Sequence, residues 1–169
     1  GVIAAQLEFV QQLRKLADQH QLLLIVDEVQ TGVGRTGNLF AYQAYGIEPD
    51  IMTLGKGLGG GVPISALLAK QHCCVFQVGD QGGTYNGNPL MTAVASAVLS
   101  EVLKPAFLPQ VQSNGAYLRQ TLQALSTQFG LGEIRGQGLL LALDTGALDA
   151  HTIVQHSLAL GLLINAPNA

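Results

Sequence analysis

Lys56 is the residue of this sequence best placed for covalent chemistry. It follows the apolar run Ile51–Leu54 and has glycine on both sides, at Gly55 and again from Gly57 onward. Glycine in such number costs backbone entropy and offers no side chain for packing, so a solvated lysine would gain nothing from it. A bulky group lying against this backbone would explain the glycines. The segment therefore predicts a lysine that anchors a cofactor covalently; the alternative is a flexible loop with an incidental lysine.

A second candidate, Asp27, directly follows the apolar run Leu22–Val26. Unbroken apolarity is typical of a strand buried on both faces of a parallel sheet. Ligands of open α/β sheets bind at the carboxyl ends of the strands, and Lys56 also follows a strand-like run. We therefore expect Asp27 and Lys56 to face one site from neighbouring strands. Asp27 and Glu28 are successive strand residues, so their side chains should point to opposite faces and not act as a carboxylate pair.

Two nucleotide-binding patterns match this region only in part. Leu22–Glu28 has the form of a Walker B strand, but the Walker A pattern fails at Asp50 and at Gly57. Gly55–Gly60 fits G-x-G-x-x-G, yet Val62 begins a strand-like run where a dinucleotide fingerprint requires a helix. Both nucleotide-binding classes are therefore disfavoured.

Pyridoxal 5′-phosphate is the leading cofactor that needs a lysine and a carboxylate together. Its aldehyde bonds to an amine, and a carboxylate beside the ring nitrogen keeps that nitrogen protonated, so that the ring accepts electrons. Lys56 and Asp27 would supply these two groups.

The composition predicts a soluble, core-forming protein. Of its 169 residues 48% are hydrophobic and 11% charged, with a net charge of −3. Charge at less than half the usual ~25% suggests that protein covers much of the surface, as at a subunit interface.

The lack of a Lys/Arg cluster argues against nucleic acid or a membrane as partner. Adjacent Cys73 and Cys74 fit a reducing cytoplasm better than a disulfide, and the histidines lack metal-ligand spacing, so we expect no metal.

The periodicity predicts a mixed α/β chain. In the first part of the chain we expect a helix over 4–20, a strand over 22–26, a short helix capped by Asn38 and ending near Gly46, and strands over 50–54 and 62–69. They are followed by a helix capped by Asn88 and running from Pro89 to about Lys104 and by a helix over 109–129. The last expected elements are a strand over 133–144 interrupted by Gly136 and Gly138, a helix over 149–160 and a strand from Leu162. Pro105 and Pro109 mark a boundary. We expect residues 1–104 to be part of a large domain with a mostly parallel sheet and flanking helices, and residues 105–169 to begin a smaller α+β domain.

Four segments resemble, in the same order, the signatures of class III (fold-type I) pyridoxal-phosphate aminotransferases. They are residues 26–37, 49–63, 82–89 and 134–138. The resemblance covers essentially the whole chain and is nearest to the acetylornithine type, in which Gly83 and Asn86 also occur in place of the more common serine and glycine. Other parts of that family would precede Gly1 and follow Ala169. We therefore expect an internal fragment that is inactive on its own.

The resemblance also implies roles for individual residues. Lys56 would be the Schiff-base lysine and Asp27 the partner of the pyridine nitrogen, both catalytic. The implied cofactor-binding residues are Asp27, Glu28, Val29 beneath the ring, Gln30 at the phenolic oxygen, Lys56, and Thr84 at the phosphate. Gly83 and Arg135 would bind substrate, with Arg135 holding a carboxylate. In this family the matching threonine reaches the neighbouring subunit's cofactor, which implies a homodimer.

The activity implied by the resemblance is transamination of N-acetylornithine with 2-oxoglutarate in arginine biosynthesis. The products would be N-acetylglutamate semialdehyde and glutamate. Another ω-aminotransferase, acting on ornithine, succinylornithine or 4-aminobutyrate, or an aminomutase, stays open. So does a truncated chain without catalytic function.

Overall fold

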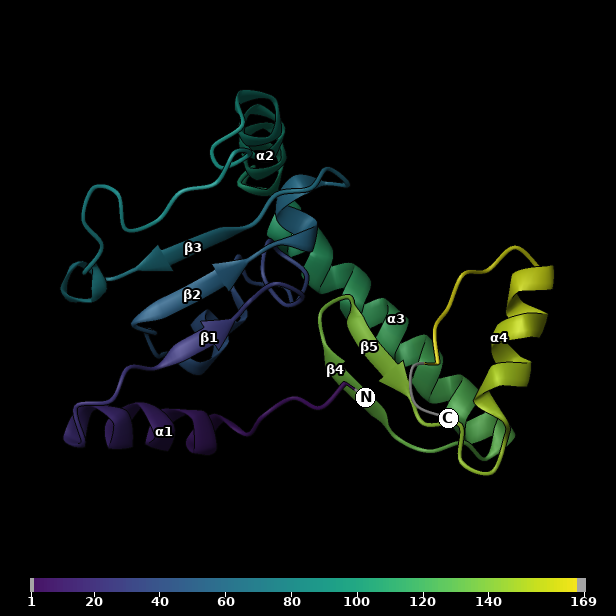
Figure 1. The fold of residues 1–169 in the computed structure, drawn as a ribbon. Coiled ribbons are helices and arrows are strands. Elements are labelled where there is room, and N and C mark those ends of the chain that lie inside the picture. The colour runs from purple at the N-terminus through teal and green to yellow at the C-terminus, as the bar shows by residue number, and fades with distance from the viewer. Residues whose placement is uncertain (1, 167–169) are drawn as a thin grey trace.

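The computed structural model describes residues 2–166, which form two groups of elements (Figure 1). The first group contains a three-stranded sheet with helix α1 below it, and the second contains a two-stranded hairpin beside the long helix α3, with α4 next to it. Helix α2 connects the two. This mixed architecture agrees with the expected α/β class.

The three-stranded sheet has the order β1-β2-β3, with β1 at Ile25–Asp27, β2 at Ile51–Leu54 and β3 at Ala66–Ala69. β1 and β2 are parallel, and β3 is antiparallel to β2. The glycine-rich segment after β2 forms one turn of 3-10 helix, η2 (Lys56–Gly59), and then leads into β3. The prediction that a strand and not a long helix follows these glycines is confirmed.

The core of the first group lies around the central strand. Met52 and Leu54 on β2 are buried and pack with Leu58 of η2 and Ala95 of α2. The buried residues alternate along β2, as expected for a strand with one face on the core. This packing fixes the backbone on both sides of Lys56.

Strand β1 departs from the expectation of burial on both faces. Leu22, Leu23 and Ile25 are 61%, 53% and 58% exposed, and the regular strand starts only at Ile25. The physical reason is position: β1 is an edge strand of the sheet, and within residues 2–166 β2 is the one element that packs extensively against it.

Helix α1 (Leu7–Gln19) lies against the 3-10 helix η1 (Ala41–Tyr45), and the Gln11 side chain donates to the Tyr45 carbonyl at 3.1 Å. The predicted cap at Asn38 is wrong. The turn starts after Phe40, whose backbone N–H donates to the Gln43 side chain at 3.1 Å.

Two helices follow the long exposed segment after the 3-10 turn η3 (Gln71–Cys73). Helix α2 (Pro89–Val102) begins as predicted, because the Asn88 side chain accepts from the Leu90 and Met91 N–H groups at 3.0 and 3.3 Å. Helix α3 (Phe107–Phe129) follows with a bend of 71°. The predicted boundary between residues 104 and 105 falls within this break and stays a prediction. No single helix among the described residues is long and apolar enough to cross a membrane.

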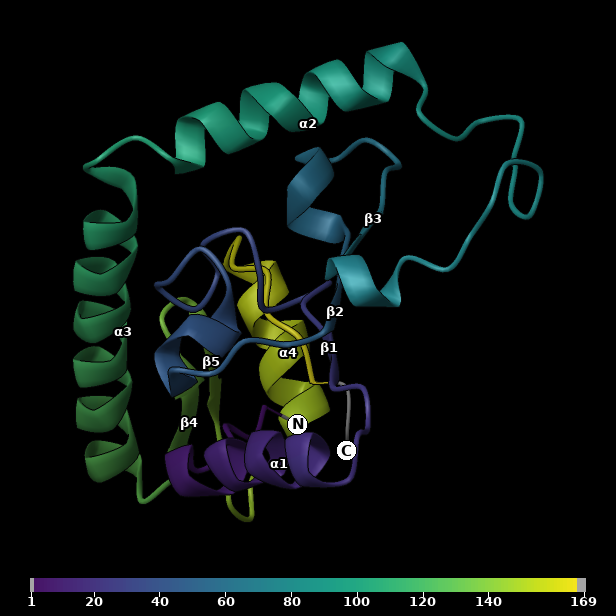
Figure 2. The same cartoon turned by 90° about the vertical axis from the view of Figure 1, so that its left-hand side faces the viewer.

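The expected strand over 133–144 is instead a hairpin of β4 (Ile134–Gln137) and β5 (Leu140–Leu143), which runs beside α3 (Figure 2). The chain turns at Gly138, whose φ is +54°. A Cβ there would lie 2.8 Å from the Arg35 carbonyl oxygen and from the Gly37 nitrogen, so only glycine fits.

The end of the described chain confirms one prediction and corrects another. Helix α4 (Ala150–Ala159) is capped by the Asp149 side chain, which accepts from His151 N–H and Thr152 N–H. A hydrogen bond from the Thr152 hydroxyl first, and then those from the Thr152 and His151 N–H groups, lower the pKa of Asp149. The predicted strand from Leu162 is absent over residues 162–166, and its remaining part lies outside the described residues.

Candidate active site

Lys56 stands immediately beyond the carboxyl end of β2, as the first residue of η2. Its φ of +41° is in the left-handed region, which costs a residue with a Cβ on the order of 1 kcal/mol. The side chain is exposed. On one side, a Cβ at Gly55 would come within 3.3 Å of a methyl of Val29, so glycine lets Val29 approach closely. The lysine is thus held in an unusual backbone conformation between tightly packed neighbours.

Asp27 is the last residue of β1 and lies opposite Thr53 in the parallel ladder. One carboxylate oxygen, Oδ1, accepts from the Val29 N–H at 2.9 Å and from the Thr53 hydroxyl at 3.2 Å. The carboxylate is otherwise exposed. Because Thr53 precedes Lys56 by three positions, the sheet register brings the two candidate groups to adjacent strand ends, as expected.

The two side chains line different cavities among the described residues. Lys56 and Gln30 line one of about 400 Å³. Asp27 and Glu28 line another of about 290 Å³. Leu140 contributes to both cavities. Asp27 and Lys56 therefore lie at adjacent strand ends, as expected, but they do not line one shared cavity.

Glu28 points into the protein and is only 2% exposed. Its Oε1 accepts from the Tyr42 N–H at 2.8 Å, and its Oε2 accepts from the Thr31 hydroxyl. Its own N–H donates to the Thr53 carbonyl at 2.9 Å. These hydrogen bonds offset the cost of burying the carboxylate, and they use both of its oxygens within the protein.

The loop over residues 31–37 joins this site to the second group of elements. The Leu139 N–H donates to the Arg35 carbonyl at 3.0 Å, and the Gln112 side chain donates to the Gly37 carbonyl at 2.7 Å. Residues of α3 and the hairpin consequently form the apolar wall of the Lys56 cavity, namely Phe107, Val111, Leu139 and Leu140. Both groups of elements must be in place for this cavity to exist.

Arg35 also lines the Lys56 cavity, and the sequence reasoning did not single it out. It is exposed, and its side chain has no hydrogen bond or ion pair within residues 2–166. Its position within the segment 26–37 could have pointed to it, because this segment resembles a family signature. The resemblance gave roles only to residues 27–30 of that segment.

Three other predicted site residues line neither cavity, although Gly136, next to Arg135, lines the Asp27 cavity. Arg135 pairs with Glu133 at 3.1 Å and with Asp144 at 3.6 Å. Gly83 and Thr84 lie in the exposed segment before α2. Within one chain, the structure does not bring any of the three to Lys56.

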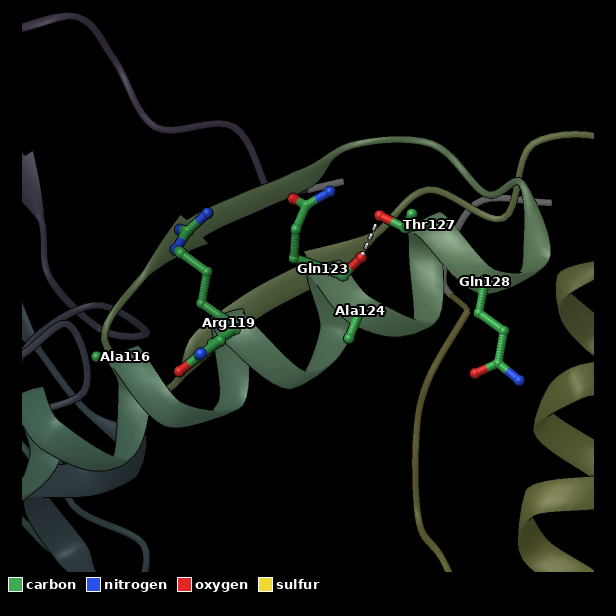
Figure 3. A pocket seen from close by; sticks show the side chains of 7 residues that line it. Ala116, Arg119, Gln123, Ala124, Thr127 and Gln128 are labelled. Atoms are coloured by element: carbon green, nitrogen blue, oxygen red, sulfur yellow. Dashed lines mark hydrogen bonds between the residues drawn. The ribbon is translucent and has the colours of Figure 1, made fainter.

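A larger cavity, of about 710 Å³, runs along one face of α3 (Figure 3). Its one charged lining residue, Arg119, donates to the carbonyls of Ile134 and Gly136. None of the predicted site residues lines it, so it is not the candidate site.

A cluster of charged residues around Asp50 holds the amino ends of β1 and β2, away from the ends that carry Asp27 and Lys56. The Asp50 Oδ2 accepts from the Leu24 N–H at 2.8 Å and from Arg14 Nη1 at 2.7 Å. Lys70 Nζ and His72 Nε2 both lie 3.6 Å from Oδ1. The Leu24 hydrogen bond first, and then Arg14, lower the pKa of Asp50 from 3.8 to about 2. The cluster ties the starts of the two strands whose other ends carry Asp27 and Lys56.

Comparison with known proteins gives a consistent family. The family model described as "Aminotransferase class-III" matches residues 1–168. Acetylornithine aminotransferase from Ralstonia nicotianae is 58% identical over 170 residues, which cover 99% of this chain and 43% of that protein. Succinylornithine transaminase from Photorhabdus laumondii is 53% identical over 146 residues, covering 85% and 36%. The chain thus spans less than half the length of these curated relatives.

Solved structures agree with the sequence comparison. The ornithine aminotransferase from Toxoplasma gondii superimposes with a TM-score of 0.86 at 36% identity, over 92% of this chain and 38% of that one. That structure was described as showing partial occupancy of PLP at the active site of the Toxoplasma protein. The superposition extends over both groups of elements in Figure 1.

Proposed function

Because the chain belongs to the class III aminotransferase family, we propose that the protein containing it transfers amino groups with pyridoxal 5′-phosphate as cofactor. The observation that carries this proposal is the register of β1 and β2, which sets Asp27 and Lys56 at adjacent strand ends. The match of the family model to residues 1–168 supports it.

The residues at these strand ends fit the cofactor chemically. Lys56 offers a primary amine for the aldehyde carbon, and Asp27 offers a carboxylate for the ring nitrogen. Gln30 would donate to the phenolic oxygen, and Val29, packed against Gly55, would support the ring. When bound, the cofactor supplies an electron sink for the substrate carbon that loses its proton.

The protein's own part in the reaction is to hold groups and to move a proton. Lys56 Nζ would anchor the cofactor and, once displaced by the incoming amine, would carry the proton between substrate and cofactor carbons as general base and acid. Asp27 would keep the ring nitrogen protonated, with its carboxylate oriented by the Val29 N–H and the Thr53 hydroxyl. The apolar wall formed by Phe107, Val111 and Leu139 would limit water in the Lys56 cavity.

The proposed reaction is transfer from N-acetylornithine to 2-oxoglutarate, giving N-acetylglutamate semialdehyde and glutamate as a step of arginine biosynthesis. The similarity to the Ralstonia protein supports this donor. Succinylornithine is the second candidate donor, because the Photorhabdus relative is nearly as similar over the part it matches. Comparing kcat/KM for the two donors in the complete protein separates these candidates.

Further assignments belong to the same proposal. Thr84 would bind the cofactor phosphate of a neighbouring subunit in a cytoplasmic homodimer, which agrees with its absence from the lining of both cavities of its own chain. Gly83, next to Thr84, would bind substrate, and Arg135 stays the candidate for binding a substrate carboxylate. Residues 1–104 would belong to the large domain and residues 105–169 to the small one.

Borohydride reduction of the complete protein, followed by peptide mapping, tests the proposal directly. We expect the pyridoxyl group on Lys56, and we expect Lys56→Ala to lose both the label and transamination. Labelling of another lysine, or full transamination by Lys56→Ala, would refute the assignment. Lys15→Ala is the control, because Lys15 is exposed on α1 and lines neither candidate cavity.

A further inference from the structure

We propose that Glu28 is a positioning residue: it holds the segment over residues 28–42 so that Asp27 and Gln30 keep their places at the site. The inference rests on the proposed function and replaces the direct cofactor contact expected for Glu28 by an indirect role. Glu28 touches Thr31 and Tyr42, not the reacting atoms.

The carboxylate closes a loop of the chain on itself. Its Oε1 binds the N–H of Tyr42, 14 positions further along, at 2.8 Å, and its Oε2 binds the hydroxyl of Thr31. The Glu28 carbonyl also accepts from the Gly32 N–H at 2.9 Å, and a Cβ at Gly32 would lie 2.8 Å from that oxygen. The segment that carries Val29 and Gln30 is therefore fastened at both of its ends.

The burial of Glu28 separates its role from that of Asp27. Asp27 is exposed and accepts hydrogen bonds through one oxygen only, whereas Glu28 is 2% exposed and both of its oxygens accept hydrogen bonds. No cation pairs with Glu28 within the described residues. The groups that face it are the Tyr42 N–H and the Thr31 hydroxyl, and neither is charged. A carboxamide oxygen can accept from the Tyr42 N–H, and its NH2 can donate to the Thr31 oxygen. The geometry thus requires the shape and hydrogen-bonding capacity of Glu28 rather than its charge.

A positioning role predicts different behaviour for two substitutions. Glu28→Gln keeps one acceptor for the Tyr42 N–H, and its amide can donate to the Thr31 oxygen. Glu28→Ala leaves both partners without their acceptor in a buried place, which is costly. The segment over 29–42 should then open more often, and Asp27 and Gln30 should lose their fixed orientation.

Hydrogen exchange of the cofactor-free complete protein measures the opening without reference to activity. For Glu28→Ala we expect amide exchange over residues 29–42 to accelerate about tenfold or more, with the amides of helix α4 unchanged. For Glu28→Gln we expect exchange near that of the wild type. Thr31→Val, which removes one donor, should give a smaller acceleration and covers the case in which Glu28→Ala does not fold. Glu48→Ala is the matched control, because Glu48 is an exposed glutamate whose partner is Lys70.

The loaded enzyme supplies a second measurement, the visible absorbance of the bound cofactor as a function of pH. Glu28→Ala should shift this titration and lower kcat, and Glu28→Gln should restore both. Unchanged exchange in Glu28→Ala and Thr31→Val would overturn the proposal. So would a Glu28→Gln protein with normal exchange but an altered titration, since that points to direct action of the charge. Failure of the wild type to transaminate would instead refute the proposed function and leave the exchange result standing.

Discussion

Replacing Asp50 by asparagine should destabilise the protein at neutral pH but not in strong acid. The Asp50 carboxylate is only 8% exposed and accepts from the Leu24 N–H and from Arg14. These contacts hold its pKa at about 2 in the folded chain, against an ordinary value of 3.8. A difference of this size corresponds to about 2 kcal/mol of stability from the ionised form.

The sign of the pH dependence follows from the lowered pKa. In the unfolded chain the group has its ordinary pKa, so the full contribution is present above about pH 4. It is lost as the pH falls from about 4 through about 2, below which both states bind the proton. The gap in unfolding free energy between wild type and Asp50→Asn should therefore be about 2 kcal/mol at pH 7 and should narrow steadily below pH 4.

Urea unfolding of the two complete proteins between pH 7 and pH 3 measures this gap. Asp18→Asn is the control, because Asp18 pairs with the same Arg14 but its side chain is 66% exposed. An exposed pair contributes about 0–1 kcal/mol, so this variant should stay close to the wild type. A gap for Asp50→Asn no larger than that for Asp18→Asn, or a gap that does not change with pH, would refute the reasoning.

Two further predictions concern the site itself. Asp27→Asn should reduce the rate of proton abstraction on the order of 10²-fold or more while cofactor binding persists, since the carboxylate acts on the ring nitrogen and not on the phosphate. Pre-steady-state kinetics with N-acetylornithine measure this rate. Turnover near that of the wild type would contradict the role of Asp27. Arg135→Ala should raise KM about tenfold or more for both substrates, because its guanidinium would bind their carboxylate, and should cost about 1 kcal/mol or less of stability, because its pairs with Glu133 and Asp144 are partly exposed. An unchanged KM would refute Arg135 as a substrate ligand.

Features fixed by neighbouring residues were predictable from the sequence. Asn88 and Pro89 set the start of α2 through local capping, and Asp149 does the same for α4. The places of Asp27 and Lys56 after apolar runs likewise required only the strand pattern.

Features that depend on distant parts of the chain were not predictable. An interruption at Gly138 was expected from the sequence, but the hairpin turn there was not, since it packs closely against the backbone of residues 35–37. The substrate role of Arg135 stays a prediction, and its ion pair with Asp144, which follows β5, could not be read from its motif. Whether a charge faces a cavity or a neighbouring strand is decided by such pairing, which the local pattern does not contain.

Part of the contact between the two groups of elements is one of backbone against backbone, because Gly138 lies against the main chain of Arg35 and Gly37. At this point the joint depends on glycine. Elsewhere it depends on the side chains of Phe107 and Gln112, which lie against Gly34 and Gly37. Val111, Leu139 and Leu140 can be exchanged to reshape the Lys56 cavity while these contacts keep their geometry. This makes the cavity wall the natural place to redesign donor preference, with the glycines left untouched.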